Sequence, residues 1–282
     1  TKNHCTVDMT PTLTPIVQFH GNKNTLVICG FSGSGYMVYE KWFTDAMSLH
    51  KKLKINMLTD ANAEIDLKDF HSIENALENI ETVYHCAGHV SFHRNDRKKV
   101  FEINEEGTRK IVNACLQKKI KNLCHVSSLA VIRNSDYQEK LNENIYWKYS
   151  GTESAYAISK YKAELEVWRG IEEGLNAVIV NPGVILTSGF WNQSSSRVFE
   201  TCYKGNMFYP VGTTGYIAAK DVAECMIRLI ERKCFSNRYI LIEENYSFKY
   251  FFSSTNILIC WIFFVKNIHL TAHIGSMMTA VI

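Results

Sequence analysis

The sequence has few of the features that mark membrane proteins and nucleic-acid-binding proteins. The apolar run at 257–265 stops at nine residues, whereas a helix that crosses a bilayer needs roughly 20. Lys and Arg outnumber Asp and Glu by only 31 to 28 and are dispersed along the chain, which argues against a basic binding stripe. We therefore expect no nucleic-acid partner. We favour a buried or interface position for 257–265 over a membrane contact, which remains the alternative.

The cysteines and histidines lack the spacings that hold metals. Nine cysteines are scattered without a Cys-x-x-Cys pair, and several lie inside apolar runs. An odd number of scattered cysteines is typical of reduced, buried thiols, so we predict a cytoplasmic protein. His85 and His89 stand at i and i+4, but Gly88 lies between them just past an expected strand. We predict no metal site.

A glycine-rich turn follows the first apolar run. Residues 25–29 have the composition of a short buried strand, Gly30, Gly33 and Gly35 follow at once, and 36–52 has helical spacing of apolar residues. Backbone N–H groups at the start of a helix in this setting bind a pyrophosphate. The turn alone is a weak signal, because most glycine turns carry no such function.

An acidic residue closes the next strand. Residues 54–58 are expected to form that strand, and Asp60 follows it. A carboxylate at this position can bind both ribose hydroxyls of NAD and repel the extra phosphate of NADP. Asp60 therefore favours NAD slightly over NADP as the cofactor, although an ordinary turn aspartate is an equal alternative.

Strands and helices alternate along the rest of the chain. This order predicts an α/β fold, a Rossmann-like doubly wound parallel sheet with a small C-terminal substrate lobe. Ligands of such sheets bind at the carboxyl ends of the strands. Residues 187–217 are read as irregular substrate-side loops with a short helix, and Asp221 is predicted to cap the helix that follows. The expected strands are 82–86, 122–126, 177–180 and 238–242, and the expected helices are 70–80, 95–118, 152–170 and 221–232.

The chain divides into four segments on this reading. Residues 1–24 hold two of the four prolines and are expected to be a loose leader. Residues 25–186 form the predicted dinucleotide-binding domain. Residues 187–250 supply substrate loops and a returning helix and strand, and 251–282 is an atypical apolar end.

Tyr156 and Lys160 lie one turn apart on the same face of an expected helix. An ammonium group near a phenol favours the phenolate, so we expect Lys160 to lower the pKa of Tyr156. A phenol tuned in this way can exchange a proton while hydride moves to or from carbon. Such a pair is common on helix surfaces. It indicates a catalytic site only in combination with the motifs that precede it in the chain.

Several short motifs, in order and on the expected elements, resemble the extended short-chain dehydrogenase/reductase superfamily. The resemblance is greatest to its NAD-dependent epimerase/dehydratase family, in the dihydroflavonol-reductase-like branch, and covers about 25–250. It implies an NAD(P)-dependent oxidoreductase or epimerase that acts on a small-molecule carbonyl or alcohol, with a homodimer as a compatible assembly. The motifs are Tyr84-His-Cys-Ala-Gly88, Ile103-Asn-x-x-Gly-Thr108, Val126-Ser-Ser128, Tyr156-x-x-x-Lys160, Asn181-Pro-Gly-Val-Ile185 and Lys220-Asp-Val-Ala223.

The resemblance implies a role for each matching residue. Tyr156 would be the acid/base, and Ser128 would bind the substrate oxygen. Lys160 would bind the nicotinamide ribose, and Asn104 would support the helix that carries Tyr156. The other residues with implied cofactor contacts are Asp66, Leu67, Ala87, Gly88, Pro182, Val184 and Ile185.

The chain also departs from the family pattern. Tyr36 stands where the third glycine of the turn is expected, and that glycine allows close helix–strand packing. Asn181 stands where an arginine is usual before Pro-Gly. The alternative reading is therefore a nucleotide-binding or regulatory protein on the same fold that has lost turnover.

Overall fold

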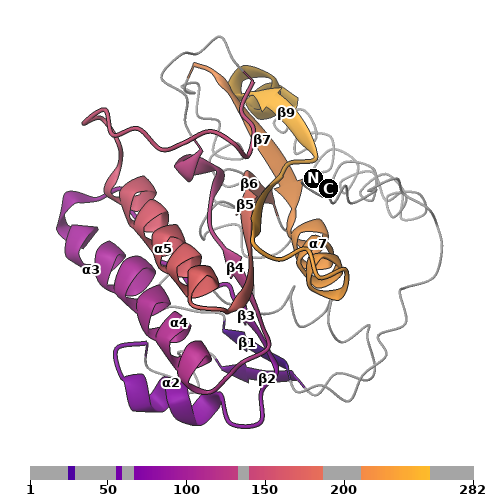
Figure 1. The fold of residues 1–282 in the computed structure, drawn as a ribbon. Helices are drawn as coiled ribbons and strands as arrows, with labels where there is room; N and C mark the ends of the chain where they lie inside the picture. The colour runs from indigo at the N-terminus through magenta and orange to yellow at the C-terminus, as the bar shows by residue number, and fades with distance from the viewer. Residues whose placement is uncertain (1–24, 29–54, 59–66, 133–139, 187–210, 255–282) are drawn as a thin grey trace, which may run out of the picture.

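The computed structural model describes residues 25–28, 55–58, 67–132, 140–186 and 211–254 (Figure 1). The predictions that concern Gly30, Gly33, Gly35, Tyr36, Asp60, Asp66 and 257–265 lie outside these residues. Within them, no helix is both long enough and apolar enough to cross a membrane.

Six parallel strands form the main sheet, in the order β2-β1-β3-β4-β5-β8. Non-consecutive neighbours mean that the chain crosses over the sheet between strands, as the alternation of elements predicts. The Rossmann-like fold class is therefore confirmed. The strands are β1 (Thr25–Ile28), β2 (Ile55–Leu58), β3 (Thr82–His85), β4 (Asn122–Val126), β5 (Asn176–Pro182) and β8 (Asn237–Leu241).

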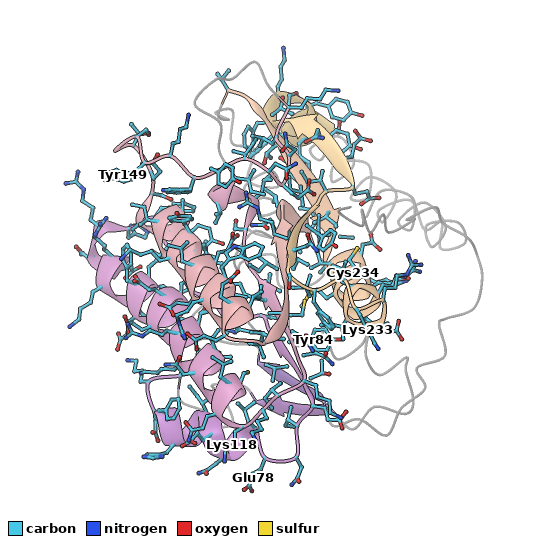
Figure 2. All side chains as sticks on the ribbon, in the orientation of Figure 1. Glu78, Tyr84, Lys118, Tyr149, Lys233 and Cys234 are labelled. Atoms are coloured by element: carbon cyan, nitrogen blue, oxygen red, sulfur yellow. The ribbon has the colours of Figure 1, made fainter. Side chains whose placement is uncertain are left out.

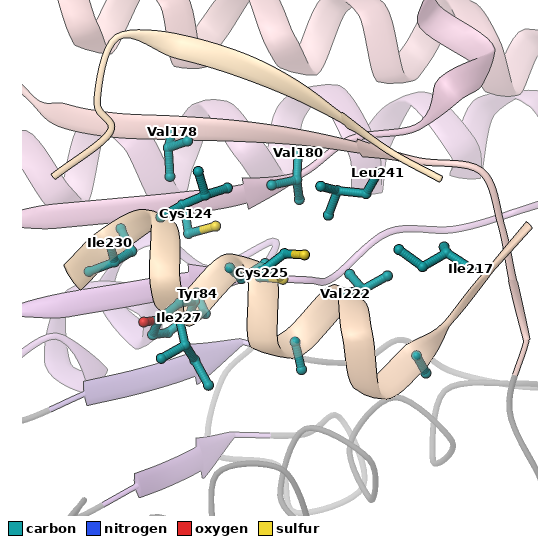
Figure 3. Close-up of a cluster of buried hydrophobic side chains, with 14 of the residues drawn as sticks. Tyr84, Cys124, Val178, Val180, Ile217, Val222, Cys225, Ile227, Ile230 and Leu241 are labelled. Carbon is teal, nitrogen blue, oxygen red and sulfur yellow. The ribbon is translucent and has the colours of Figure 1, made fainter. Parts of the chain in front are cut away.

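Helices cover both faces of this sheet (Figure 1). Successive side chains of a strand point to opposite faces, so each central strand supplies both layers of core. Val83 and Leu123 pack in the cluster under the helices α2 (Phe70–Ala76), α4 (Gly107–Gln117) and α5 (Ala155–Glu172). Their neighbours Tyr84 and Cys124 pack in the opposite cluster under α7, which spans Ala219–Glu231 (Figure 3).

A second, three-stranded sheet lies beyond the carboxyl end of β5 (Figure 1). It contains β6 (Val184–Leu186), β7 (Thr213–Ala218) and β9 (Glu244–Ser247). The prediction of irregular structure through 217 is wrong for β7. That strand pairs in parallel with β6 and antiparallel with β9, so partners distant in sequence define it. Phe251 stacks on Tyr216 of β7, with ring centroids 4.4 Å apart.

The helix predicted for 95–118 runs without a gap from Arg94 to Gln117, but it is not α-helical throughout. A 3₁₀ turn (Arg94–Asp96) leads into α3 (Arg97–Phe101), then a π-helical segment (Glu102–Glu106), and then α4. A π-helical segment inserted in a helix frequently marks a functional site. Here it contains Asn104, for which the family resemblance implies a supporting role.

Three smaller expectations need correction. The helix predicted for 70–80 ends at Ala76, and Asn79 adopts a left-handed φ of 59° that no helix can continue through. Asp221 is not a cap, because α7 begins directly after β7 with Ala218 as its N-cap and Asp221 in its first turn. The prediction of reduced thiols fails at Cys234, which is disulfide-bonded, while Cys86, Cys115 and Cys124 are free thiols.

Candidate active site

Tyr156 and Ser128 meet at the carboxyl end of the main sheet. Ser128 follows β4 and Tyr156 lies in the first turn of α5, where the Ser154 hydroxyl accepts a hydrogen bond from the Ala157 N–H. A hydrogen bond from the Ser128 side chain favours the phenolate of Tyr156 and so lowers the pKa of the phenol. Burial has the larger, opposite effect, and the pKa of Tyr156 is raised overall. The prediction that Lys160 lowers this pKa is therefore wrong.

The Lys160 ammonium binds the main chain of β4. It donates a hydrogen bond of 2.6 Å to the Val126 carbonyl on β4, and its side chain is buried. Burial lowers the pKa of Lys160 to about 8, although Glu164 and Cys86 both raise it. Lysine is an amine with three donors, so the Val126 carbonyl leaves two N–H groups for other acceptors.

Asn104 joins the loop after β3 to α5. Its side-chain oxygen accepts a hydrogen bond of 2.6 Å from the His89 N–H, and its amide donates to the His89 carbonyl at 3.0 Å. The same amide donates to the Ser159 hydroxyl at 2.9 Å, and Ser159 in turn donates to the Tyr156 carbonyl at 2.8 Å. One buried side chain therefore holds both the loop and the first turn of α5.

Gly88 lies close to two of these buried groups. A Cβ added at Gly88 would lie 3.3 Å from the Asn104 side-chain oxygen and 3.5 Å from the Lys160 nitrogen. The absence of a side chain therefore lets the backbone at the end of β3 approach both Asn104 and Lys160. The N–H groups that Lys160 has left fit the ribose hydroxyls of a nicotinamide dinucleotide as hydrogen-bond donors.

The remaining predicted contacts are more dispersed. Leu67 packs against Gly107 at the start of α4, where an added Cβ would lie 3.5 Å from Leu67 Cδ1. Ala87 is buried in the cluster under α2, α4 and α5, and Pro182 ends β5. The side chains of Val184 and Ile185 pack into two different hydrophobic clusters. The structure therefore groups Ser128, Tyr156, Lys160, Asn104 and Gly88, and the other contacts stay predictions.

Sequence reasoning missed a buried polar network behind Lys160. Glu164 lies one turn beyond Lys160 and accepts a hydrogen bond from the Asn181 amide, which also donates to the Ser128 carbonyl at 3.1 Å. Arg238 of β8 pairs with Glu164 at 3.5 Å. The spacing of Glu164 from Lys160 is visible in the sequence, but nothing there identifies Arg238 as its partner.

Two buried histidines lie near the same lysine. His85 and His125 have ring centroids 4.9 Å apart, and His85 Nε2 lies 2.9 Å from the Thr108 hydroxyl. Burial and the nearby Lys160 charge lower the pKa of His85 to about 3, and they also lower that of His125. Both rings are neutral at physiological pH. The described residues contain no cluster of three or more His, Cys, Asp or Glu that could hold a metal.

The doubly wound sheet, with a Ser, a Tyr and a Lys converging beyond β4, defines the class of short-chain dehydrogenase-like proteins. The family model "NAD dependent epimerase/dehydratase family" matches residues 41–240. The chain therefore belongs to this family, as the motifs predict.

The individual proteins that the chain resembles share limited sequence identity with it. "Sterol demethylase protein B" of Methylococcus capsulatus is 31% identical over 191 residues, which cover 64% of this chain and 55% of that protein. "Cinnamoyl-CoA reductase 1" of Arabidopsis thaliana is 25% identical over 189 residues, 64% of this chain and 54% of that protein. The chain thus spans about half the length of these relatives. The crystal structure of gox2253 superposes with a TM-score of 0.72, at 23% identity and over 84% of this chain and 74% of that one, which shows a shared fold.

Proposed function

We propose that the protein is an NAD(P)-dependent oxidoreductase or epimerase that moves hydride at a carbonyl or hydroxyl carbon. The observation that carries this proposal is the hydrogen bond between Ser128 and Tyr156, with the buried Lys160 one turn away. The bound nicotinamide would supply or accept the hydride. The substrate would be a small-molecule carbonyl or alcohol.

Three side chains of the protein would take part in the other steps of the reaction. Hydride addition to a carbonyl places negative charge on its oxygen, which needs a proton and a second donor. Tyr156 would donate that proton from its hydroxyl, and the raised pKa keeps the phenol protonated before reaction. Ser128 would donate a hydrogen bond to the same oxygen and fix its angle. Lys160 would hold the ribose from the same face of α5 as Tyr156.

The preference for NAD over NADP is predicted from Asp60, which lies outside the residues that the structure describes. Asp60 favours NAD over NADP if it faces the 2′-position of the ribose. Asp60→Ala is therefore expected to relax a preference for NAD. Tighter binding of NADPH than NADH by the wild type would contradict the role proposed for Asp60.

The test combines cofactor binding with a variant that removes one hydroxyl. We expect the full-length protein to bind NADH or NADPH in a calorimetric titration. With a carbonyl substrate, Tyr156→Phe should lower kcat by about 10²–10⁴-fold, the usual effect of a positioned acid/base, and leave the cofactor Kd nearly unchanged. Tyr161→Phe, five residues further along α5, is the matched control and should keep wild-type turnover. Equal turnover by Tyr156→Phe and wild type would refute the proposed role.

The second candidate is a nucleotide-binding or regulatory protein without turnover, and Tyr36 in the glycine turn is the feature that favours it. This reading predicts cofactor binding without reduction of any carbonyl in a broad substrate panel. Cytoplasmic location and a homodimer stay predictions, to be checked by fractionation and by sedimentation.

A further inference from the structure

A large apolar side chain lies in solvent next to Tyr156. Phe92 follows β3 and is 75% exposed, and Val90 in the same loop is 45% exposed. The Phe92 and Tyr156 rings are 6.0 Å apart in an edge-to-face arrangement. Exposed apolar residues are common singly, but here one is in contact with the proposed acid/base.

The exposure of Phe92 is built into its loop, because hydrogen bonds hold the chain on both sides of it. Asn104 binds both backbone groups of His89. The buried Ser91 hydroxyl donates to Asp96 at 2.6 Å and accepts from the His93 N–H at 3.2 Å. Ser91 is buried, whereas Phe92 next to it is exposed. These hydrogen bonds fix the backbone of the loop on both sides of Phe92, while the Phe92 ring itself is exposed.

We infer that Phe92 forms an apolar wall of the substrate site and selects substrates that carry an aromatic or similarly planar apolar group beside the reacting carbon. This inference rests on the proposed function, because the Tyr156 hydroxyl fixes where the reacting oxygen lies. Aromatic rings prefer edge-to-face and offset-stacked contacts, and a planar substrate group next to Tyr156 can form one with Phe92. A short aliphatic or polyhydroxylated group would gain little there.

The experiment compares two aldehydes that differ in their planar group, cinnamaldehyde and propanal. Phe92→Ala should lower kcat/KM for cinnamaldehyde about tenfold, mainly through KM, as expected for loss of one apolar wall. The kcat/KM of Phe92→Ala for propanal should stay within about twofold of the wild-type value, since propanal has no group that reaches Phe92. Phe92→Tyr should retain most of the cinnamaldehyde activity. Leu165→Ala, which truncates an exposed apolar residue elsewhere on α5, is the control and should change neither value.

A binding measurement separates this inference from the proposed function. Cinnamyl alcohol and 1-propanol are titrated into the protein in excess NAD and followed by saturation-transfer NMR. Tighter binding of cinnamyl alcohol that Phe92→Ala removes supports the inference, even if neither aldehyde is reduced and the proposed function fails. Equal losses for both ligands, no effect of Phe92→Ala, or no preference for cinnamyl alcohol in the wild type overturns it.

Discussion

Arg238 of β8 reaches Glu164 of α5, and their charged groups lie 3.5 Å apart with only 15% and 2% of the side chains exposed. Arg238 also donates to the Glu143 carbonyl at 2.8 Å and to the Ile145 carbonyl. The Asn181 amide also donates to Glu164. Burial raises the pKa of Glu164, whereas hydrogen bonds from Ser127 and Asn181 and the charges of Arg238 and Lys160 lower it. The network therefore holds a carboxylate behind Lys160 and ties the loop before α5 to the edge of the main sheet.

Glu164→Gln should make Lys160 easier to deprotonate. Glu164 raises the pKa of Lys160, so its neutralisation lowers that pKa from about 8. The upper pH limit of NADH binding should move to lower pH, with a loss of affinity at pH 8 of roughly two- to tenfold. Calorimetric titrations from pH 6 to pH 9 measure this. Glu172→Gln, an exposed change on the same helix, is the control. Superimposable profiles for wild type and Glu164→Gln would contradict the coupling.

Lys160→Met should stabilise the fold, and more so at neutral than at alkaline pH. The pKa of Lys160 is about 8 in the folded protein, below its ordinary value of 10.5. The folded state therefore disfavours the charged form, and this cost is fully present below pH 8 and is lost as the pH rises to about 10.5. The gain in free energy of unfolding should be at most roughly 3 kcal/mol at pH 7 and fall below about 1 kcal/mol at pH 10. Urea denaturation at pH 7 and at pH 10 checks this. An equal gain in stability at the two pH values would show that the lowered pKa of Lys160 is not its cause.

Asn104→Ala should destabilise the fold through the groups that it leaves unpaired. The substitution removes both partners of the His89 backbone and one of the Ser159 hydroxyl. A fully buried group without a partner costs about 1–3 kcal/mol, but the His89 groups are only partly buried and Ser159 keeps its bond to Tyr156, so we expect a total loss of roughly 2–4 kcal/mol in urea denaturation. Asn113→Ala removes one exposed hydrogen bond to Arg169 and should cost less than about 0.5 kcal/mol. Similar costs for the two variants would show that Asn104 has no special structural role.

Gly183→Ala and Gly107→Ala should have opposite effects. A Cβ at Gly183 would overlap the Gly215 carbonyl oxygen, so the backbone of β7 would have to move. We expect a loss of about 1–3 kcal/mol, the usual cost of overpacking. At Gly107 the nearest atom is 3.5 Å away, and alanine favours the helix by roughly 0.5–1 kcal/mol. Thermal unfolding of both variants measures the difference, and a stable Gly183→Ala protein would contradict the packing of the two sheets.

Much of the fold was predictable because its signals are local. Buried parallel strands such as β3 and β4 are short apolar runs, and α5 begins at a serine with apolar residues at helical spacing. The grouping of Ser128, Tyr156 and Lys160 also followed from order, because the carboxyl ends of parallel strands share one edge. β7 could not be predicted in this way, since its partners β6 and β9 lie far from it in the chain.

The sequence by itself determined the order of strands and helices, the family, and which residues carry chemically useful groups, because these depend on residue type and spacing. The tertiary structure decided the environment of those groups. The pKa of Tyr156 rises because burial outweighs the hydrogen bond from Ser128. Glu164 finds Arg238 only because β8 pairs with β5, which places residues 74 positions apart side by side. Desolvation and long-range pairing depend on which surfaces the fold buries together, and no local pattern encodes them.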